Sequence, residues 1–428
     1  VYFEYTKGFY MKKQAKENIL ANESLFITTP DSFDAGFRMN TSFGLRPLEH
    51  AHDEEVVPKI GSLEFVRQAS WAVGAIKLFT ENEEVRAVAR TPATLANAIE
   101  ALGCKLEFRY HPELFQKKHR RGILAFKRPN SVNLWKFSDL KKKSSYVQNT
   151  YRQNVVSALY DLGLCDSSTR FNQMQLTDIG QSLADNFLKG QNNDLNKILS
   201  YWVCNNSEQK NKDYTELLSP DYCSSGEKNI LRQCLNTFDN DSDSQKRIRL
   251  IKSMKSITTK EKKCWNELRR LLKNGDLSGE RHAHQIENAI RFEKIKNHVR
   301  ALYNECTNYM FKCNSDSCSF SILCNVENII KAYKNLKHSV ETYHKAAQSK
   351  LPIVGHDNLL LNSAYQNIKN TLRYLVEHEG RALICKGDDI AKGPLLKEDG
   401  FKPVDEGTQN WGHPKLNQFY KLWRECDE

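Results

Sequence analysis

The chain has 428 residues, of which 39% are hydrophobic and 10% aromatic, so it can build buried cores and is not expected to be globally disordered. No stretch approaches the roughly 18 apolar residues of a membrane span, and no secretory signal pattern opens the chain, so we expect a cytoplasmic protein without membrane contact. The formal net charge of +11 favours an anionic partner, and the 12 cysteines are expected to be free thiols or metal ligands.

Residues 1–103 are expected to form a mixed α/β N-terminal domain with a short strand at 24–29 and a helix over 62–81, where apolar residues recur at helical spacing. Thr91 followed by Pro92 predicts a second helix start, because Thr is a favoured N-cap and proline fits the first turn. Gly103 is expected to end that helix. The polar stretch at 40–58 is interpreted as a solvated acidic loop, with a metal site at 50–55 as the alternative.

The positive charge is concentrated in one segment. Residues 1–100 carry a net charge of −3, residues 101–152 carry +10, and residues 153–428 carry +4. A general solubility bias would spread the charge more evenly. The segment at 101–152 is therefore the predicted point of contact with an anionic partner.

Residues 104–190 are expected to form a basic domain that contains short strands at 105–110 and 123–127 and a helix from 147 that Gly163 ends. A returning strand is expected at 170–176, followed by a helix. This order resembles the winged helix-turn-helix superfamily over residues 101–190. The matching residues are Leu159, Leu162, Gly163, Leu164, Leu176, Thr177, Asp178, Ile179 and Gly180. The resemblance implies a domain that contacts DNA or, in the alternative, protein.

A helix that enters the major groove is apolar toward its core and polar, without acids, on its other face. The predicted helix over 146–162 fits, since it has no acid before Asp161. Gln and Asn side chains can pair with adenine and Arg with guanine, while lysines just before the helix suit phosphates. The candidate nucleic-acid-binding residues are Lys117, Lys118, Arg120, Arg121, Lys141, Lys142, Lys143, Ser144, Gln148, Asn149, Arg152, Gln153 and, on the wing, Arg170.

Residues 191–244 are expected to be an irregular polar connector anchored by Trp202. Residues 245–428 are expected to form a helical C-terminal domain whose long helices contact protein partners. A basic run at 246–255 fits an amphipathic helix. Its charged face is interpreted as solvated, with a second contact to a nucleic-acid backbone as the alternative.

Four cysteines, Cys306, Cys313, Cys318 and Cys324, fall within 19 residues. Four converging thiolates would bind zinc or an iron–sulfur cluster. Their spacing lacks the usual Cys-x-x-Cys, and the alternative is four ordinary thiols at a helix–loop–helix junction. Otherwise no cofactor is expected. His282 and His284 fall in a predicted helix and are interpreted as surface histidines, because His-x-His shares a face only in a strand.

No phosphate-binding glycine-rich loop, no nucleophile elbow and no convincing nuclease signature occur in the sequence. We therefore expect a mainly α protein with small β elements that binds double-stranded DNA without catalysis, as a regulator or as a subunit of a larger assembly. The layout resembles accessory proteins of bacterial anti-phage or mobile-element systems. The alternatives are a divergent metal-dependent nuclease and a scaffold whose winged helix contacts protein.

Overall fold

The computed structural model describes residues 43–117, 126, 136–142, 147, 149–167, 170–189, 193–205, 213–237, 242–255, 280–347, 360–361, 364, 367–379, 382–393, 396 and 414–427. These residues are mainly helical with one small antiparallel sheet, which confirms the predicted fold class. The chain divides into two compact units. Unit 1 comprises residues 1–52 and 284–411, and unit 2 comprises residues 53–283 and 412–428. Both units are discontinuous, whereas the sequence analysis expected four consecutive domains.

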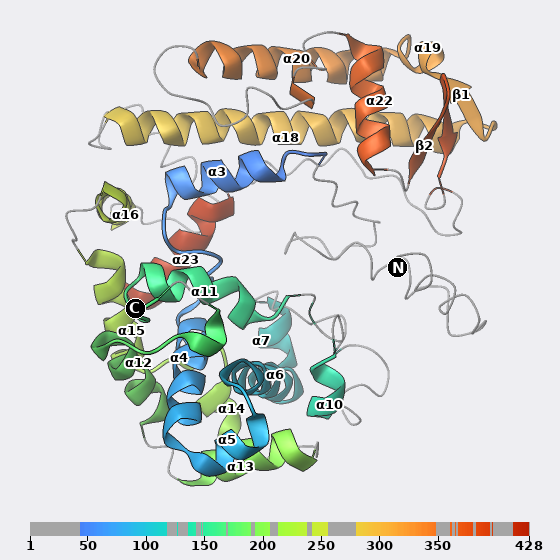
Figure 1. The fold of residues 1–428 in the computed structure, drawn as a ribbon. Helices are drawn as coiled ribbons and strands as arrows, with labels where there is room; N and C mark the ends of the chain where they lie inside the picture. Colours follow the sequence, from blue (N-terminus) through green and yellow to red (C-terminus); the bar gives the residue numbers. More distant parts are fainter. Residues whose placement is uncertain are drawn as a thin grey trace. The chain divides into compact units, whose positions relative to one another are not determined.

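Unit 2 is a helical assembly around α4, which is buried over most of its length and packs against α6, α11, α12 and α15 (Figure 1). Its elements are α4 (Val66–Glu81), α5 (Glu83–Ala89), α6 (Pro92–Tyr110), α7 (Pro112–Lys117), α10 (Phe137–Leu140), α11 (Tyr151–Asp161), the 3-10 helix η1 (Phe171–Gln173), α12 (Asp178–Leu188), α13 (Asn193–Asn205), α14 (Asp213–Leu218), α15 (Ser225–Asn236), α16 (Ser242–Lys255) and α23 (Pro414–Asp427). The C-terminal helix α23 packs on α15.

Three sequence predictions for unit 2 are wrong. Gly103 does not end α6, which continues to Tyr110, so the strand expected at 105–110 is helical. Residues 170–176 form η1 and a single bridge between Cys165 and Leu176 in place of a returning strand. The connector expected at 191–244 contains α13, α14 and α15. The strand expected at 123–127 lies outside the described residues, apart from Phe126, which is helical.

The turn between α11 and α12 was predicted well. Gly163 adopts a φ of +71° after the C-cap of α11, and the Thr177 side chain accepts a hydrogen bond from the Gly180 amide at the start of α12. The Thr177 amide also donates to the Leu164 carbonyl over 3.2 Å. This close return brings the Leu164 carbonyl against the first turn of α12, where a Cβ on Gly180 would lie 1.9 Å from the carbonyl oxygen. Only glycine fits there.

Replacing Gly180 by alanine is therefore expected to destabilise unit 2 by about 1–3 kcal/mol, because the backbone of the turn must move to relieve the overlap. Urea unfolding measures the change. The matched control is Gly163→Asn, since no atom lies within 4 Å of a Cβ at that position and Asn tolerates a positive φ. Equal stability of the Gly180→Ala and wild-type proteins would show that the turn is not tightly packed.

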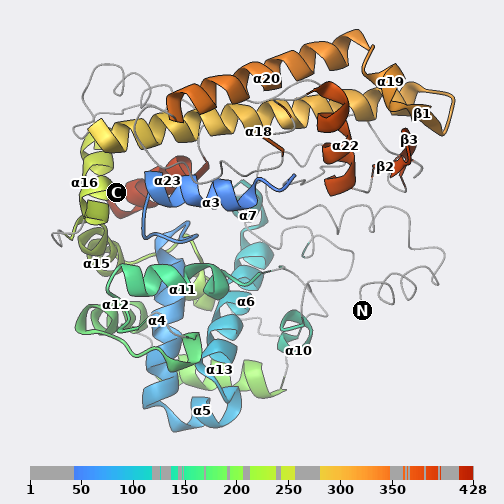
Figure 2. The ribbon, with the colours of Figure 1, turned by 45° about the horizontal axis from the view of Figure 1, so that its top comes forward.

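Unit 1 is built on two long helices, α18 and α20, which lie side by side in both ribbon views (Figures 1 and 2). Its elements are α3 (Arg46–Val56, as far as residue 52), α18 (Glu280–Lys312, from residue 284), β1 (Ser317–Ser319), α19 (Phe320–Leu323), α20 (Glu327–Ala347), α22 (Ile368–Glu379), β2 (Leu383–Lys386) and β3 (Asp389–Lys392). The prediction of a polar loop at 40–58 is therefore wrong for residues 46–56, which form α3.

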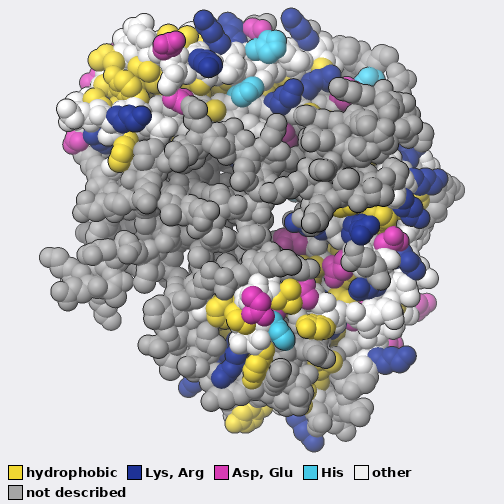
Figure 3. Space-filling view, turned by 180° about the vertical axis from the view of Figure 1, so that it is seen from behind, with side chains coloured by type: hydrophobic (Ala, Val, Ile, Leu, Met, Phe, Trp, Pro, Cys, Tyr) yellow, Lys and Arg dark blue, Asp and Glu magenta, His cyan; other side chains and the backbone are white. Residues whose placement is uncertain are grey.

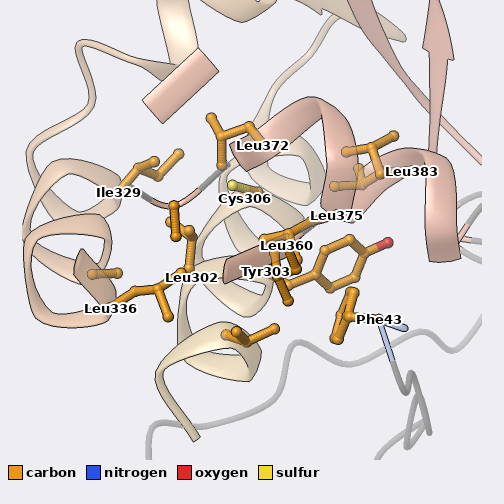
Figure 4. Packing of buried hydrophobic residues seen from close by; sticks show 14 of the residues in the cluster. Phe43, Leu302, Tyr303, Cys306, Ile329, Leu336, Leu360, Leu372, Leu375 and Leu383 are labelled. Atoms are coloured by element: carbon orange, nitrogen blue, oxygen red, sulfur yellow. The ribbon is translucent and has the colours of Figure 1, made fainter. Parts of the chain in front are cut away.

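The core of unit 1 forms where α18, α20 and α22 meet. Figure 4 shows Leu302 and Tyr303 of α18 with Leu336 of α20 and Leu375 of α22 in one buried cluster. At the edge of this core lies the three-stranded sheet, with the order β1-β3-β2 and all neighbours antiparallel. The sheet joins residues near 318 to residues near 390, so it closes the unit across a long stretch of sequence.

Candidate nucleic-acid interface

Helix α11 corresponds to the helix that the sequence analysis predicted to contact DNA bases. It starts at Tyr151 rather than near residue 147. Thr150 is its N-cap, and a capping box holds the first turn: the Gln153 amide donates to Thr150 Oγ1, and the Thr150 amide donates to Gln153 Oε1 over 3.0 Å. The Gln153 side chain is exposed but occupied by this cap. Reading a base edge with Gln153 would require the cap to open.

Arg152 is engaged inside unit 2. Its Nε donates to the Asn97 side chain over 3.0 Å, and its guanidinium lies 5.2 Å from the centre of the Phe171 ring. Its backbone amide donates to Glu100 over 3.2 Å. These contacts tie α11 to α6 and η1. They argue against base reading by Arg152. Together with the capping box, they satisfy the backbone amides of Arg152 and Gln153 within the protein.

The η1 segment carries Arg170 to the same end of α11. The Asn172 side chain accepts a hydrogen bond from the Ala93 amide over 3.0 Å, which fixes η1 at the start of α6. Arg170, the N-cap of η1, is exposed, and so is Arg90, which ends α5 two residues before Pro92. Arg90 was not selected from the sequence. The signal that could have found it is its place just before the predicted helix cap.

Two of the candidate lysines, Lys141 and Lys142, are exposed after α10. Lys142 pairs with Asp139 at 3.0 Å, and the hydrogen bond from this ammonium lowers the pKa of the Asp139 carboxyl. Asn149 is exposed just before the N-cap of α11. The candidates Lys118, Arg120, Arg121, Lys143, Ser144 and Gln148 lie outside the described residues, and of Lys117 only the backbone, at the end of α7, is described.

The second basic run forms α16, as predicted, and buries Leu250, Ile251 and Met254. Arg247 is also buried and donates to the Pro58 carbonyl over 3.4 Å and to Ser244. Lys252 remains exposed. Arg247, which the sequence analysis placed on a solvated face, therefore packs inside the protein and stabilises the fold.

Among the described residues, no group of three or more His, Cys, Asp or Glu residues suited to a metal occurs, so zinc at Cys306, Cys313, Cys318 and Cys324 stays a prediction. Cys306 is buried in the α18 core, where desolvation raises the pKa of its thiol. Cys318 lies 3.3 Å from the Met310 sulfur, and burial raises its pKa to about 11. Cys313 and Cys324 are half-buried.

The surface assignment of His282 is wrong. His282 is buried, and its Nε2 lies 3.0 Å from the Val56 carbonyl oxygen. Desolvation lowers the pKa of its imidazole to about 4. His284 is exposed, as expected. His52, from the predicted acidic loop, is buried in unit 1, and its Nε2 lies 2.8 Å from the Tyr343 hydroxyl.

Comparison with protein families, with curated proteins and with solved structures finds no match for the chain. None of the helices in the described ranges is long and apolar enough to cross a bilayer.

Proposed function

We propose that the protein binds nucleic acid, double-stranded DNA foremost, and that unit 2 contacts the phosphate backbone beside the start of α11. The observation that carries the proposal is the sign of the exposed side chains on the segments that flank α11. Asn149 precedes its N-cap, Arg170 precedes Phe171, which contacts Arg152, and Lys141 follows α10, the described element before α11. These side chains are cationic or neutral, while Glu100 is buried and Asp139 is paired with Lys142.

The proposed contact is to phosphates rather than to base edges. Arg152 and Gln153 hold the start of α11 in place, so the residues best suited to reading bases serve the domain itself. Lysines and arginines on phosphates position a protein on a duplex without reading its sequence. We therefore expect weak sequence preference and a strong dependence of affinity on salt.

The decisive experiment measures binding of the full chain to double-stranded DNA, single-stranded DNA and RNA over a range of salt concentrations. We expect Lys141→Gln with Lys142→Gln to lower the slope of log affinity against log salt by about one, because each lost phosphate contact removes about one unit and Lys142 is already paired with Asp139. At about 0.1 M salt this corresponds to a loss of about tenfold. The pair Lys189→Gln with Lys197→Gln removes the same charge from exposed positions of unit 2 and is the control.

Equal salt slopes for the two double variants and the wild type would contradict the proposed site. Absence of binding to any nucleic acid at low salt would favour a scaffold that contacts protein. Adding Mg²⁺ to the DNA arm tests for cleavage, which would favour the divergent nuclease. We further propose a reducing compartment such as the cytoplasm, since each described cysteine is a free thiol.

A further inference from the structure

The outward face of α20 in unit 1 carries a second concentration of positive charge. Lys331, Lys334, His338 and Lys345 are exposed at spacings of three, four and seven residues, which places them along one side of the helix. Lys337 is half-exposed beside them. From 328 to 340 the helix has no acidic residue, whereas acids occur at its start and in its last two turns.

Helix α18 extends this basic face. His298 of α18 lies 2.8 Å from the Ser339 hydroxyl of α20, which joins the two helices at this point. Desolvation first, and then the charges of Lys294 and His338, lower the pKa of His298, so both groups lie close to its ring. Lys294 is exposed. Figure 3 shows Lys, Arg and His side chains along the top of that view, over α18 and α20, with acidic side chains between some of them. We call Lys294, Lys331, Lys334, Lys337 and His338 the α18–α20 basic face.

Among the described residues, some other lysines of unit 1 pair with carboxylates, whereas the lysines of this face do not. Lys296 is paired with Glu49 and, at 2.7 Å, with Glu293, and Lys369 is paired with Asp388 at 3.3 Å. Within the described ranges, none of the four lysines of the basic face forms an ion pair. A face adapted only to solvent mixes both signs, so the basic stretch of α20 between Glu327 and Glu341 points to an anionic partner.

The partner is a polyanion rather than a lipid surface. An amphipathic helix binds a bilayer by inserting its apolar side. In α20 that side, with Ile329, Leu336 and Val340, is buried in the core of unit 1 (Figure 4). The exposed residues between the lysines, among them Asn328 and Asn335, are polar. The face can offer charge and hydrogen bonds but no insertion.

We propose that the α18–α20 basic face is a second binding surface for the phosphate backbone of a nucleic-acid duplex. From Lys331 to His338 the helix rises about 10 Å. That length matches roughly three base pairs at about 3.4 Å per phosphate on each strand. The surface rests on the proposed function only for the identity of the partner, because its charges, spacing and lack of ion pairs are independent of the site beside α11.

The test uses the full chain, a DNA duplex and four proteins: wild type, Lys334→Gln with Lys337→Gln, Lys141→Gln with Lys142→Gln, and all four substitutions together. We expect the α20 pair to lower the salt slope by about two and to weaken binding by tens of fold near 0.1 M salt, with the combined variant weaker than either. The control is Lys312→Gln with Lys386→Gln, which removes the same charge from exposed positions of unit 1 outside this face. Circular dichroism verifies that each variant is folded.

The outcomes separate the two proposals. A normal slope for the α20 pair, with a reduced slope for Lys141→Gln with Lys142→Gln, overturns this inference and supports the site beside α11. The reverse pattern supports this inference and overturns that site. Both proposals are overturned if the duplex does not bind the wild type. They are also overturned if DNA does not bind but vesicles of phosphatidylserine do, and if that binding depends on Lys334 and Lys337.

Discussion

Replacing Arg67 by alanine is expected to lower the free energy of unfolding of unit 2 by about 3–5 kcal/mol, because it leaves a buried carboxylate without its partner. The Arg67 guanidinium lies 3.2 Å from Glu227, and both side chains are buried. It also donates to the carbonyl oxygens of Leu217 and Tyr222 and lies 5.2 Å from the centre of the Phe187 ring. One side chain of α4 thus holds α12, α14 and the start of α15.

Urea unfolding followed by tryptophan fluorescence measures this loss, since five of the six tryptophans belong to unit 2. The control is Arg86→Ala on α5, where the side chain is 45% exposed and a change within about 0.5 kcal/mol is expected. A double-mutant cycle with Arg67→Met and Glu227→Gln isolates the pair. The double variant should lose less than the sum of the single variants, because neither charge is then left alone. A loss below about 1 kcal/mol for Arg67→Ala would contradict the role of the ion pair.

Elements set by local chemistry could be predicted from the sequence. The start of α6 at Thr91 and Pro92 and the start of α12 at Thr177 depend on side chains within three residues of the helix end. Gly163 follows the end of α11 for an equally local reason, because the backbone there has a positive φ, which glycine adopts easily. The long helices α18 and α20 lie in the region at 245–428 that was predicted to be helical, whereas α3 lies in a stretch that was predicted to be a loop.

Elements set by distant partners could not be predicted. The alternation at 105–110 indicated a strand, because Lys105 and Glu107 alternate with apolar residues. In the structure both are buried within α6. The Lys105 ammonium lies 5.1 Å from the centre of the Trp202 ring, and Glu107 accepts a hydrogen bond from Ser219 over 2.9 Å. These partners lie about a hundred residues later in the chain, so the sequence pattern around 105–110 does not predict the contacts.

The same distinction between local and distant causes applies to the candidate interface. The exposure of Lys141 and Lys142 is the usual outcome for lysine side chains, most of which keep their ammonium group in water. The use of Arg152 as an internal tie depends on Asn97 and Phe171, which the sequence does not bring together. The basic face of unit 1 escaped selection because its charge is spread over two helices, and its clustering is visible only once α18 and α20 are paired.

Acidification from about pH 6.5 to about pH 4 is expected to destabilise unit 2 through His282. Desolvation is the largest cause of its lowered pKa, and the nearby charges of Lys246 and Arg249 act in the same direction. The folded protein holds His282 neutral down to a pKa of about 4, whereas the unfolded chain protonates it near 6.5. The unfolded state therefore binds more protons in this range, so stability falls as the pH falls. The full difference is roughly 3 kcal/mol, and none of it is lost above about pH 7.

The measurement is the free energy of unfolding of the wild type and of His282→Gln at several pH values between 4 and 8. Glutamine can still donate to the Val56 carbonyl but does not titrate, so the difference between the two proteins isolates His282 from other groups. One such group is Asp161, whose pKa is raised by burial and which acts in the opposite direction. We expect the variant to equal or trail the wild type at pH 8 and to exceed it at pH 4, so that the two curves cross. Parallel curves would mean that solvent reaches His282 in the folded protein, which would contradict its packing at the start of α18.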